Sequence, residues 1–181
     1  MKDSHRALIV ILLIFGGLFA LYHFGSDSSR IAGVGQVRAV VGELLPDFAL
    51  TDLSSNIVRL SDHRGKVVLV HVWATWCPPC VEEMPSMETL YQTLPRNRFE
   101  ILAIGIDGDG RESVEPFMKE KGLTFPALLD PESTIGMSYG ITGVPESFIV
   151  DKNGVLVRKI IGSIDWASPK AIESLKGLID A

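Results

Sequence analysis

Both cysteines of the chain lie in one short motif, and this motif limits the fold more than any other part of the sequence. Residues 73–80 read WATWCPPC and stand between an apolar run and a helical pattern. Cysteines at this spacing, here Cys77 and Cys80, can close a small disulfide without a change of fold. The pair can then alternate between dithiol and disulfide, so the motif favours a redox-active site.

Two other interpretations of the pair stay open. A zinc site would need two more cysteine or histidine ligands at paired spacing, and the four histidines are scattered: His5, His23, His63 and His71. A purely structural disulfide would close a loop so short that it would add little stability.

Composition excludes one class of partner. The chain has 181 residues and a formal net charge of -5, without a basic stripe that could displace counterions from phosphates. We therefore expect no nucleic-acid partner. Because no second pair of ligands accompanies the cysteines, we also expect no metal, and we expect no cofactor. The length suits one packed domain with an appendage.

The appendage is an apolar segment from Ala7 to Phe24. It contains no acidic or basic residue other than His23, and Lys2 and Arg6 precede it. At about 1.5 Å per residue the segment can just cross a hydrocarbon core of about 30 Å, and the basic flank predicts a cytoplasmic N-terminus. A cleaved signal peptide is the alternative, although the segment lacks its A-x-A pattern, and a buried core helix is another.

This interpretation divides the chain into four parts. They are a cytoplasmic tail (1–6), a transmembrane anchor (7–24), a Gly- and Ser-rich linker (25–36) and a globular domain (37–181). The domain would lie outside the cytoplasm, in the periplasm or outside the cell. Thiols are oxidised there unless something reduces them, so the dithiol would need a membrane electron donor as a partner.

Strand and helix patterns alternate along the domain and predict an α/β sheet. We expect a β-hairpin within Leu44–Leu60 that lies against the sheet, followed by strands at Val67–Trp73, Phe99–Asp107, Phe125–Leu129, Glu146–Val150 and Val155–Ile161, the last two antiparallel. Helices are expected after the cysteines with a kink at Pro85, over Glu112–Lys121, and after the N-cap Ser168 with Pro169 at its first position.

Two blocks of sequence resemble the TlpA/ResA/CcmG-like membrane-anchored thiol-disulfide oxidoreductases of the thioredoxin superfamily. The first is VWATWCPPC at 72–80 with Glu83 and Pro85 after it, and the second is YGITGVPESF at 139–148. The resemblance implies a thioredoxin-like fold with an N-terminal β-hairpin and a central insertion, preceded by one transmembrane helix. It also implies reduction of protein disulfides outside the cytoplasmic membrane, such as those of apocytochrome c in cytochrome c maturation.

The resemblance assigns roles to the two blocks. Cys77, at the start of a helix, would be the nucleophile, and Cys80 would resolve the mixed disulfide. Pro145 would be a cis-proline that faces the cysteines, and it would bind substrate together with Val144 and Trp76. An ordinary turn proline is the alternative for Pro145.

Two further residues are candidates for moving protons. Glu83, one helical turn after Cys80, could accept its proton, or it could be a solvated carboxylate as Glu82 beside it is expected to be. His71 interrupts the apolar strand where this family often has Asn, so it could relay the proton of Cys80 or be a hydrogen-bonded core histidine.

Two other functions remain as alternatives. A thiol peroxidase is suggested by PDF at 46–48 and LSDHRGK at 60–66, although the P-x-x-x-[ST]-x-x-C signature is missing. A copper-binding assembly factor, or a reductase of copper-site thiols, would use Cys77 and Cys80 as soft ligands or reagents.

Overall fold

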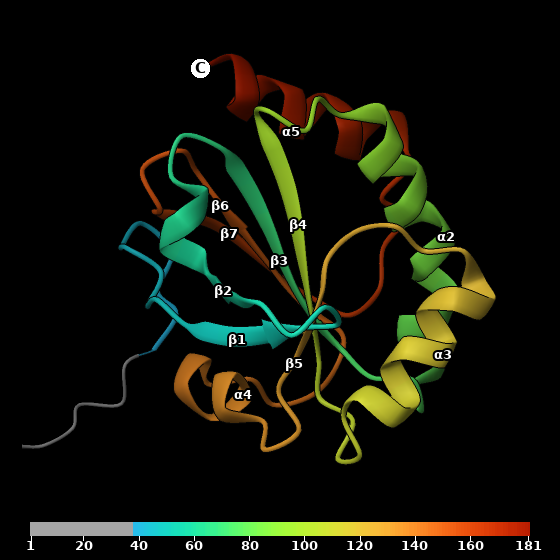
Figure 1. Ribbon diagram of the computed structural model, residues 1–181. Coiled ribbons are helices and arrows are strands. Elements are labelled where there is room, and N and C mark those ends of the chain that lie inside the picture. Colours follow the sequence, from blue (N-terminus) through green and yellow to red (C-terminus); the bar gives the residue numbers. More distant parts are fainter. Residues whose placement is uncertain (1–37) are drawn as a thin grey trace, which may run out of the picture. The chain divides into compact units, whose positions relative to one another are not determined.

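The structure, a computed structural model, describes residues 38–181, and it is organised around one mixed β-sheet. In this part of the chain seven strands pair in the order β2-β1-β5-β4-β3-β6-β7 (Figure 1). The strands are β1 (Ala49–Asp52), β2 (Ile57–Arg59), β3 (Val67–Trp73), β4 (Phe99–Gly105), β5 (Ala127–Leu129), β6 (Glu146–Val150) and β7 (Leu156–Ile161).

The central strand β3 explains the long apolar run before the cysteines. It pairs in parallel with β4 and antiparallel with β6, and all seven of its residues are buried. A strand that is covered on both faces needs apolar side chains at successive positions, not alternate ones. Because β3 ends at Trp73, the motif with Cys77 lies at the carboxyl edge of the sheet.

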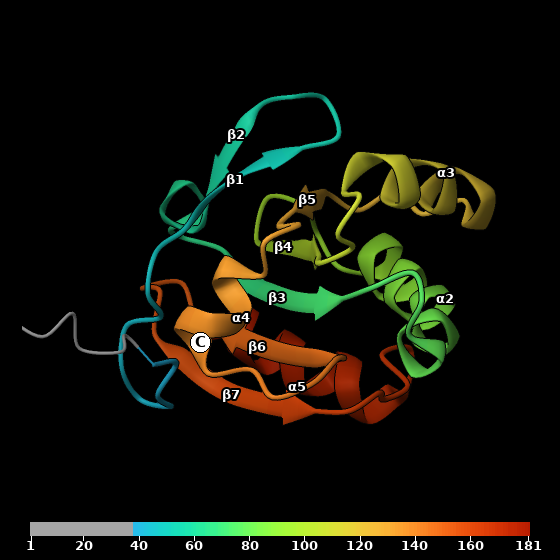
Figure 2. The same ribbon diagram turned by 90° about the horizontal axis from the view of Figure 1, so that it is seen from below.

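Helices cover both faces of the sheet (Figures 1 and 2). The helices α2 (Pro78–Thr93), α3 (Arg111–Lys121) and α5 (Pro169–Asp180) pack on one face through one apolar cluster. The short helix α4 (Thr134–Tyr139) and the 3-10 helix η1 (Leu60–His63) contribute to a second cluster on the other face. The sheet thus lies between two apolar layers, which is how strands with side chains on both faces become buried.

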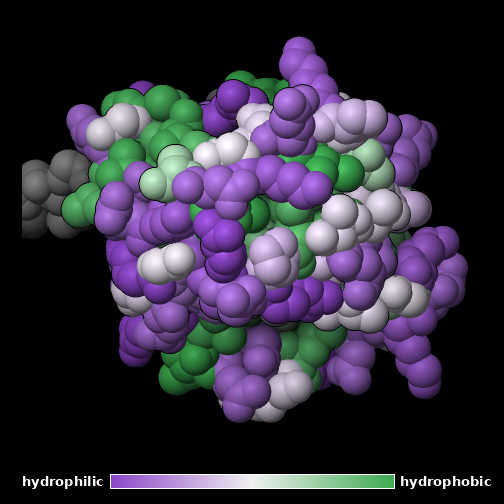
Figure 3. Space-filling model, turned by 90° about the horizontal axis from the view of Figure 1, so that it is seen from above, coloured by the Kyte–Doolittle hydropathy of each residue, from purple (hydrophilic) through white to green (hydrophobic). Residues whose placement is uncertain are grey.

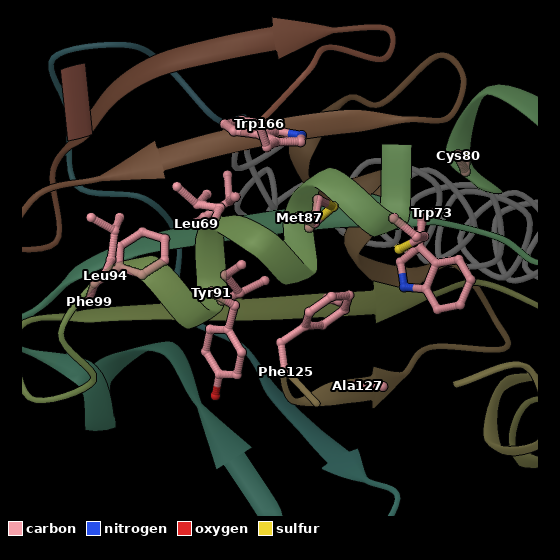
Figure 4. Packing of buried hydrophobic residues seen from close by; sticks show 14 of the residues in the cluster. Leu69, Trp73, Cys80, Met87, Tyr91, Leu94, Phe99, Phe125, Ala127 and Trp166 are labelled. Atoms are coloured by element: carbon pink, nitrogen blue, oxygen red, sulfur yellow. The ribbon is translucent and has the colours of Figure 1, made fainter. Parts of the chain in front are cut away.

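Helix α2 presents an apolar stripe to the first of these clusters. Its buried side chains include Met84, Met87, Leu90 and Tyr91. The ring of Tyr91 lies 5.9 Å from that of Phe125 in an edge-to-face arrangement, and Figure 4 shows both rings on one side of the helix. The Met-containing stripe therefore serves core packing.

Most of the expected elements are confirmed. The hairpin β1–β2 forms, and it extends the sheet by pairing β1 with β5 instead of lying on the sheet. Strands β6 and β7 are antiparallel, and the side chain of Ser168 accepts a hydrogen bond from the amide of Ala171 at the start of α5. Helix α2 is one continuous helix through Pro85.

Some boundaries were wrong, and one helix was not predicted. Strand β4 ends at Gly105, two residues before Asp107, because the chain leaves the sheet to begin the loop that leads to α3. Strand β5 begins at Ala127 and not at Phe125. Helix α4 was not predicted, because it has only six residues, contains Gly136 and ends at Gly140 in the left-handed conformation.

The predicted tail, anchor and linker (1–36) lie outside the described residues. Within residues 38–181 we find no helix with the length and apolar character needed to cross a membrane. Figure 3 shows one face of the surface, where hydrophilic side chains predominate and hydrophobic ones gather in separate patches.

Candidate functional site

The two cysteines lie at the first turn of α2, where they form a disulfide. Cys77 is the N-cap residue, and the amide of Cys80 points to its Sγ atom at 3.3 Å. Pro78 and Pro79 occupy the first helical positions, where an amide hydrogen would have no partner within the helix. Cys77 keeps 5% of its surface exposed and Cys80 none, so Cys77 is the sulfur that a second molecule can reach first.

A second loop faces Cys77 from 67 residues further along the chain. The Val144–Pro145 peptide bond is cis, as the resemblance implied, and the carbonyl oxygen of Val144 lies 3.5 Å from Sγ of Cys77. The loop leads directly into β6, which pairs with β3. The β3–β6 pairing thus brings the two sequence blocks to the same edge of the sheet.

An apolar groove runs along this loop. Its volume is about 420 Å³, and it is lined by Trp76, Ile106, Met137, Ile141 and Val144, together with small and polar residues of the same segments. The side chains of Trp76 and Met137 are among the most exposed large apolar groups of residues 38–181, at 65% and 69%. Such exposure beside a reactive disulfide is typical of a binding surface.

A buried polar contact lies on the inner side of α2. His71 and Glu83 are almost completely inaccessible, and Nε2 of His71 lies 3.4 Å from Oε1 of Glu83. The other carboxylate oxygen accepts hydrogen bonds from Nε1 of Trp166 at 2.9 Å and from the amide of Ile164 at 3.3 Å. Glu83 is therefore not a solvated helix carboxylate, whereas Glu82 beside it is exposed.

Burial moves the pKa values of this pair in opposite directions. Loss of water raises the pKa of Glu83 to about 7, although its two hydrogen bonds partly oppose the shift. Burial lowers the pKa of His71 to about 3, so His71 is neutral at neutral pH. The group that titrates near pH 7 is therefore Glu83.

The opposite nitrogen of His71 contacts Ser147, which the sequence had not indicated. Nδ1 of His71 lies 2.8 Å from Oγ of Ser147, and the two residues are direct partners in the β3–β6 register. A hydroxyl group can donate to or accept from this nitrogen, so Ser147 is compatible with either neutral tautomer. A serine in an apolar strand was the only signal for it, and nothing in the sequence signalled Trp166.

A cavity opens beside Glu83. It has a volume of about 310 Å³ and is lined by Glu82, Glu83, Ser86, Ser163, Ile164 and Asp165. Glu83 also lies one turn after Cys80 on α2, a spacing that places Cβ atoms roughly 5–6 Å apart. Glu83 thus lies on the same face of α2 as Cys80 and lines this cavity.

The predicted site residues form two adjacent groups. Cys77, Trp76, Val144 and Pro145 lie together at the edge of the sheet, where Trp76 is exposed, and His71 and Glu83 lie behind the first turn of α2. Cys80 joins the groups, because it is bonded to Cys77 and precedes Glu83 by one turn. This arrangement allows thiol-disulfide exchange at Cys77 and proton transfer between Cys80 and the buried pair His71 and Glu83.

Known proteins with similar sequences and structures support the same chemistry. The sequence model of the AhpC/TSA family matches residues 41–159. The thiol-disulfide oxidoreductase ResA of Geobacillus kaustophilus (strain HTA426) is 37% identical, and the alignment covers 97% of this chain and 99% of that protein.

Two solved structures have the same fold. A thiol:disulfide interchange protein of the thioredoxin family from Chlorobium tepidum TLS superposes with a TM-score of 0.65 at 28% identity, covering 76% of this chain and 96% of that one. StoA from Bacillus subtilis gives a TM-score of 0.61 at 25% identity, with 77% and 98% covered. The expectation of a thioredoxin-like α/β fold is confirmed.

Proposed function

We propose, from the premise that this chain belongs to the AhpC/TSA family and is a ResA-like thiol-disulfide oxidoreductase, that it acts as a reductase of protein disulfides outside the cytoplasm. The observation that carries the proposal is the placement of Cys77 at the N-cap of α2, 3.5 Å from the carbonyl oxygen of Val144. The reduced dithiol would be the active form, and the disulfide in this structure would be its product state.

The first step is attack by the Cys77 thiolate on one sulfur of a substrate disulfide. A new bond joins Cys77 to that sulfur, and the second substrate sulfur leaves as a thiolate. Unpaired amide groups at the helix N-terminus stabilise the attacking thiolate. Because Cys77 is the more exposed cysteine, it is suited to this role.

In the second step Cys80 loses its proton and attacks Sγ of Cys77. The Cys77–Cys80 disulfide forms, the bond to the substrate breaks, and the substrate leaves with both of its sulfurs reduced. Glu83 would accept the proton, since its raised pKa of about 7 leaves it able to bind a proton near neutral pH. His71 would relay that proton through Nε2.

Substrate would bind along the loop before Pro145. An extended substrate segment can pair with the backbone of Val144, as strands are added to other exposed backbone edges. Trp76 would contact the same segment from the side of the motif. The substrates would be proteins with disulfides, and apocytochrome c is the one that we propose.

The setting of this reaction follows from the N-terminal sequence. We propose that residues 7–24 anchor the chain once in the cytoplasmic membrane, with residues 1–6 in the cytoplasm and a linker (25–36) before the domain from residue 37. A membrane electron donor would return the disulfide to the dithiol after each cycle.

The test is to measure the reduction potential of the Cys77–Cys80 pair against glutathione buffers. We expect a value well below that of the glutathione couple, whereas a strongly oxidising value would overturn the assignment as a reductase. Cys80→Ser should retain substrate on Cys77 as a mixed disulfide, and Cys77→Ser is the matched control that should retain none. Rapid peroxide consumption by the pure protein would instead support a peroxidase.

A further inference from the structure

A buried carboxylate outside the predicted site, that of Asp107, accepts hydrogen bonds from the loop that precedes Cys77. Asp107 follows β4 and has 1% of its surface exposed. Its two carboxylate oxygens accept the amide hydrogen of Thr75, at 3.2 and 3.1 Å, and one of them also accepts the hydroxyl hydrogen of Thr75 at 2.5 Å. All three of these contacts are made to one residue, two positions before Cys77.

These bonds fix the turn between β3 and α2. The amide of Cys77 donates to the carbonyl oxygen of Ala74 at 3.3 Å, which closes the turn around Thr75. The amide of Ile106 donates to the carbonyl oxygen of Trp73 at 3.0 Å, so the segment with Asp107 stays beside β3 until the turn begins. Asp107 thereby connects the end of β4 to the turn that carries the nucleophile.

The charge of Asp107 has no cation partner in an ion pair within residues 38–181. Arg111, the cation that is nearest along the chain, bonds to the carbonyl oxygens of Asp52 and Leu53, and its ion pair is with Glu115. Asp109 on the same loop is exposed and accepts a hydrogen bond from Ser113. A buried carboxylate without a counterion acts on nearby charges more strongly than an exposed one does.

We propose that Asp107 is a positioning residue of the redox site, which holds the turn before Cys77 through Thr75 and contributes a negative charge at this turn, two residues before the Cys77 thiolate. This charge opposes the stabilisation that the N-terminus of α2 gives to the thiolate. The reduced form becomes less stable relative to the disulfide, so the dithiol gives its two electrons to a substrate disulfide more readily. The inference rests on exchange at Cys77 and is independent of the identity of the substrate.

The test uses the full chain with two substitutions that separate charge from geometry. Asp107→Asn keeps the shape and removes the charge, and Thr75→Val removes the hydroxyl bond and keeps the charge. The readouts are the thiol pKa of Cys77, from the pH dependence of its alkylation in the reduced protein, and the equilibrium with glutathione. Thr75→Ser is the control for Thr75→Val, and it should keep the wild-type values because it keeps the hydroxyl group.

We expect Asp107→Asn to lower the Cys77 thiol pKa by about one unit, as for loss of a neighbouring like charge. The equilibrium with glutathione should shift about tenfold toward the dithiol, which corresponds to about 30 mV. Thr75→Val should slow substrate reduction without lowering the pKa. Equal pKa values in Asp107→Asn and wild type, or the same decrease in Thr75→Val, would overturn the proposal.

A second pair of variants keeps the test decisive if Asp107→Asn does not fold. Gly108 is exposed, and a Cβ atom built there meets nothing within 4 Å. Gly108→Lys adds a cation next to Asp107 and should lower the thiol pKa of Cys77, whereas Gly108→Ser should leave it unchanged. No difference between these two variants would also overturn the proposal. An inactive wild-type protein would instead contradict the proposed function.

Discussion

The two ends of helix α2 are built in different ways. Its first turns carry Cys77, Cys80 and Glu83, and here the polar groups depend on a few contacts from other elements. Its last turns carry Leu90 and Tyr91, which are buried among apolar side chains. One end therefore sets the chemistry and the other holds the helix in place.

The region around the first turns of α2 also contains buried polar atoms whose hydrogen bonds are not satisfied. Oε1 of Glu83 and Nε2 of His71 lack a hydrogen bond of good geometry although both are buried, and they face each other at 3.4 Å. Unsatisfied buried polar groups cost stability. The apolar end of α2 can offset this cost, because burial of large side chains contributes about 1.5–3 kcal/mol each.

The largest effect on stability is expected from Leu90→Ala, which tests whether the two ends are independent. Leu90 is fully buried, so the substitution should lower the free energy of unfolding by about 2–5 kcal/mol. Urea denaturation measures this change. The thiol pKa of Cys77 should stay as in wild type, and a shifted pKa would show that the ends are coupled. The exposed neighbour Thr89→Ala is the control, with a change below about 0.5 kcal/mol.

Glu83→Gln should have the next largest effect, and this effect should grow as pH rises from about 4.5 to 7. The pKa of Glu83 is about 7 in the folded chain against an ordinary value of 4.5, so the folded state binds the proton more tightly. Stability is therefore lost as pH rises from about 4.5 to 7, by an amount on the order of 3 kcal/mol. The uncharged Gln should remove this loss.

Unfolding measured from pH 5 to pH 8 checks this prediction. His71 acts in the other direction, because its lowered pKa costs stability as pH falls below 6.5, and this part should remain in Glu83→Gln. The pH dependence of disulfide reduction should also become flatter near pH 7. An unchanged slope of stability above pH 5 would mean that Glu83 is not the titrating group.

Trp166→Phe should change the pKa of Glu83 and have a smaller effect on the stability of the fold. Nε1 of Trp166 donates to Oε2 of Glu83 at 2.9 Å, and this bond favours the ionised carboxylate. Its loss should raise the pKa of Glu83 above 7 by about one unit. Carboxyl NMR titration measures the shift. The double variant with Glu83→Gln should show no such titration, and an unmoved pKa would contradict the role of the indole.

The smallest effect is expected at a surface ion pair that belongs to neither end of α2. Lys121 and Glu120 lie 3.0 Å apart, and both side chains are exposed. Lys121→Ala should change the free energy of unfolding by less than about 0.5 kcal/mol, because solvent screens such pairs. Denaturation in urea would show a larger change if this pair mattered for the fold.

The sequence predicted the parts of the molecule that have a simple pattern. Strand β3 was readable because burial on both faces demands a continuous apolar run, and α2 because its apolar residues recur at helical spacing. The placement of the two blocks at one edge of the sheet came from the resemblance. Helix α4 was missed because its glycines give it little helical propensity.

The polar contacts behind Cys80 could not be predicted from single residues. His71 and Ser147 meet only because β6 pairs with β3 in one particular register. Trp166 reaches Glu83 from the segment after β7, and no local pattern marks that approach. The raised pKa of Glu83 follows from this burial, so the sequence could suggest its role without giving its ionisation.

The two outer strands of the sheet have a consequence for self-association. Strand β2 has only three residues, and β7 carries Arg158 and Lys159, and its pairing with β6 shifts register opposite Ile149 and Val150. Short, charged and irregular edges resist the addition of a strand from another chain. A protein that handles extended polypeptides would otherwise be at risk of aggregating with them. We therefore expect it to remain monodisperse in the presence of unfolded substrates, which would bind beside Val144 and leave after exchange.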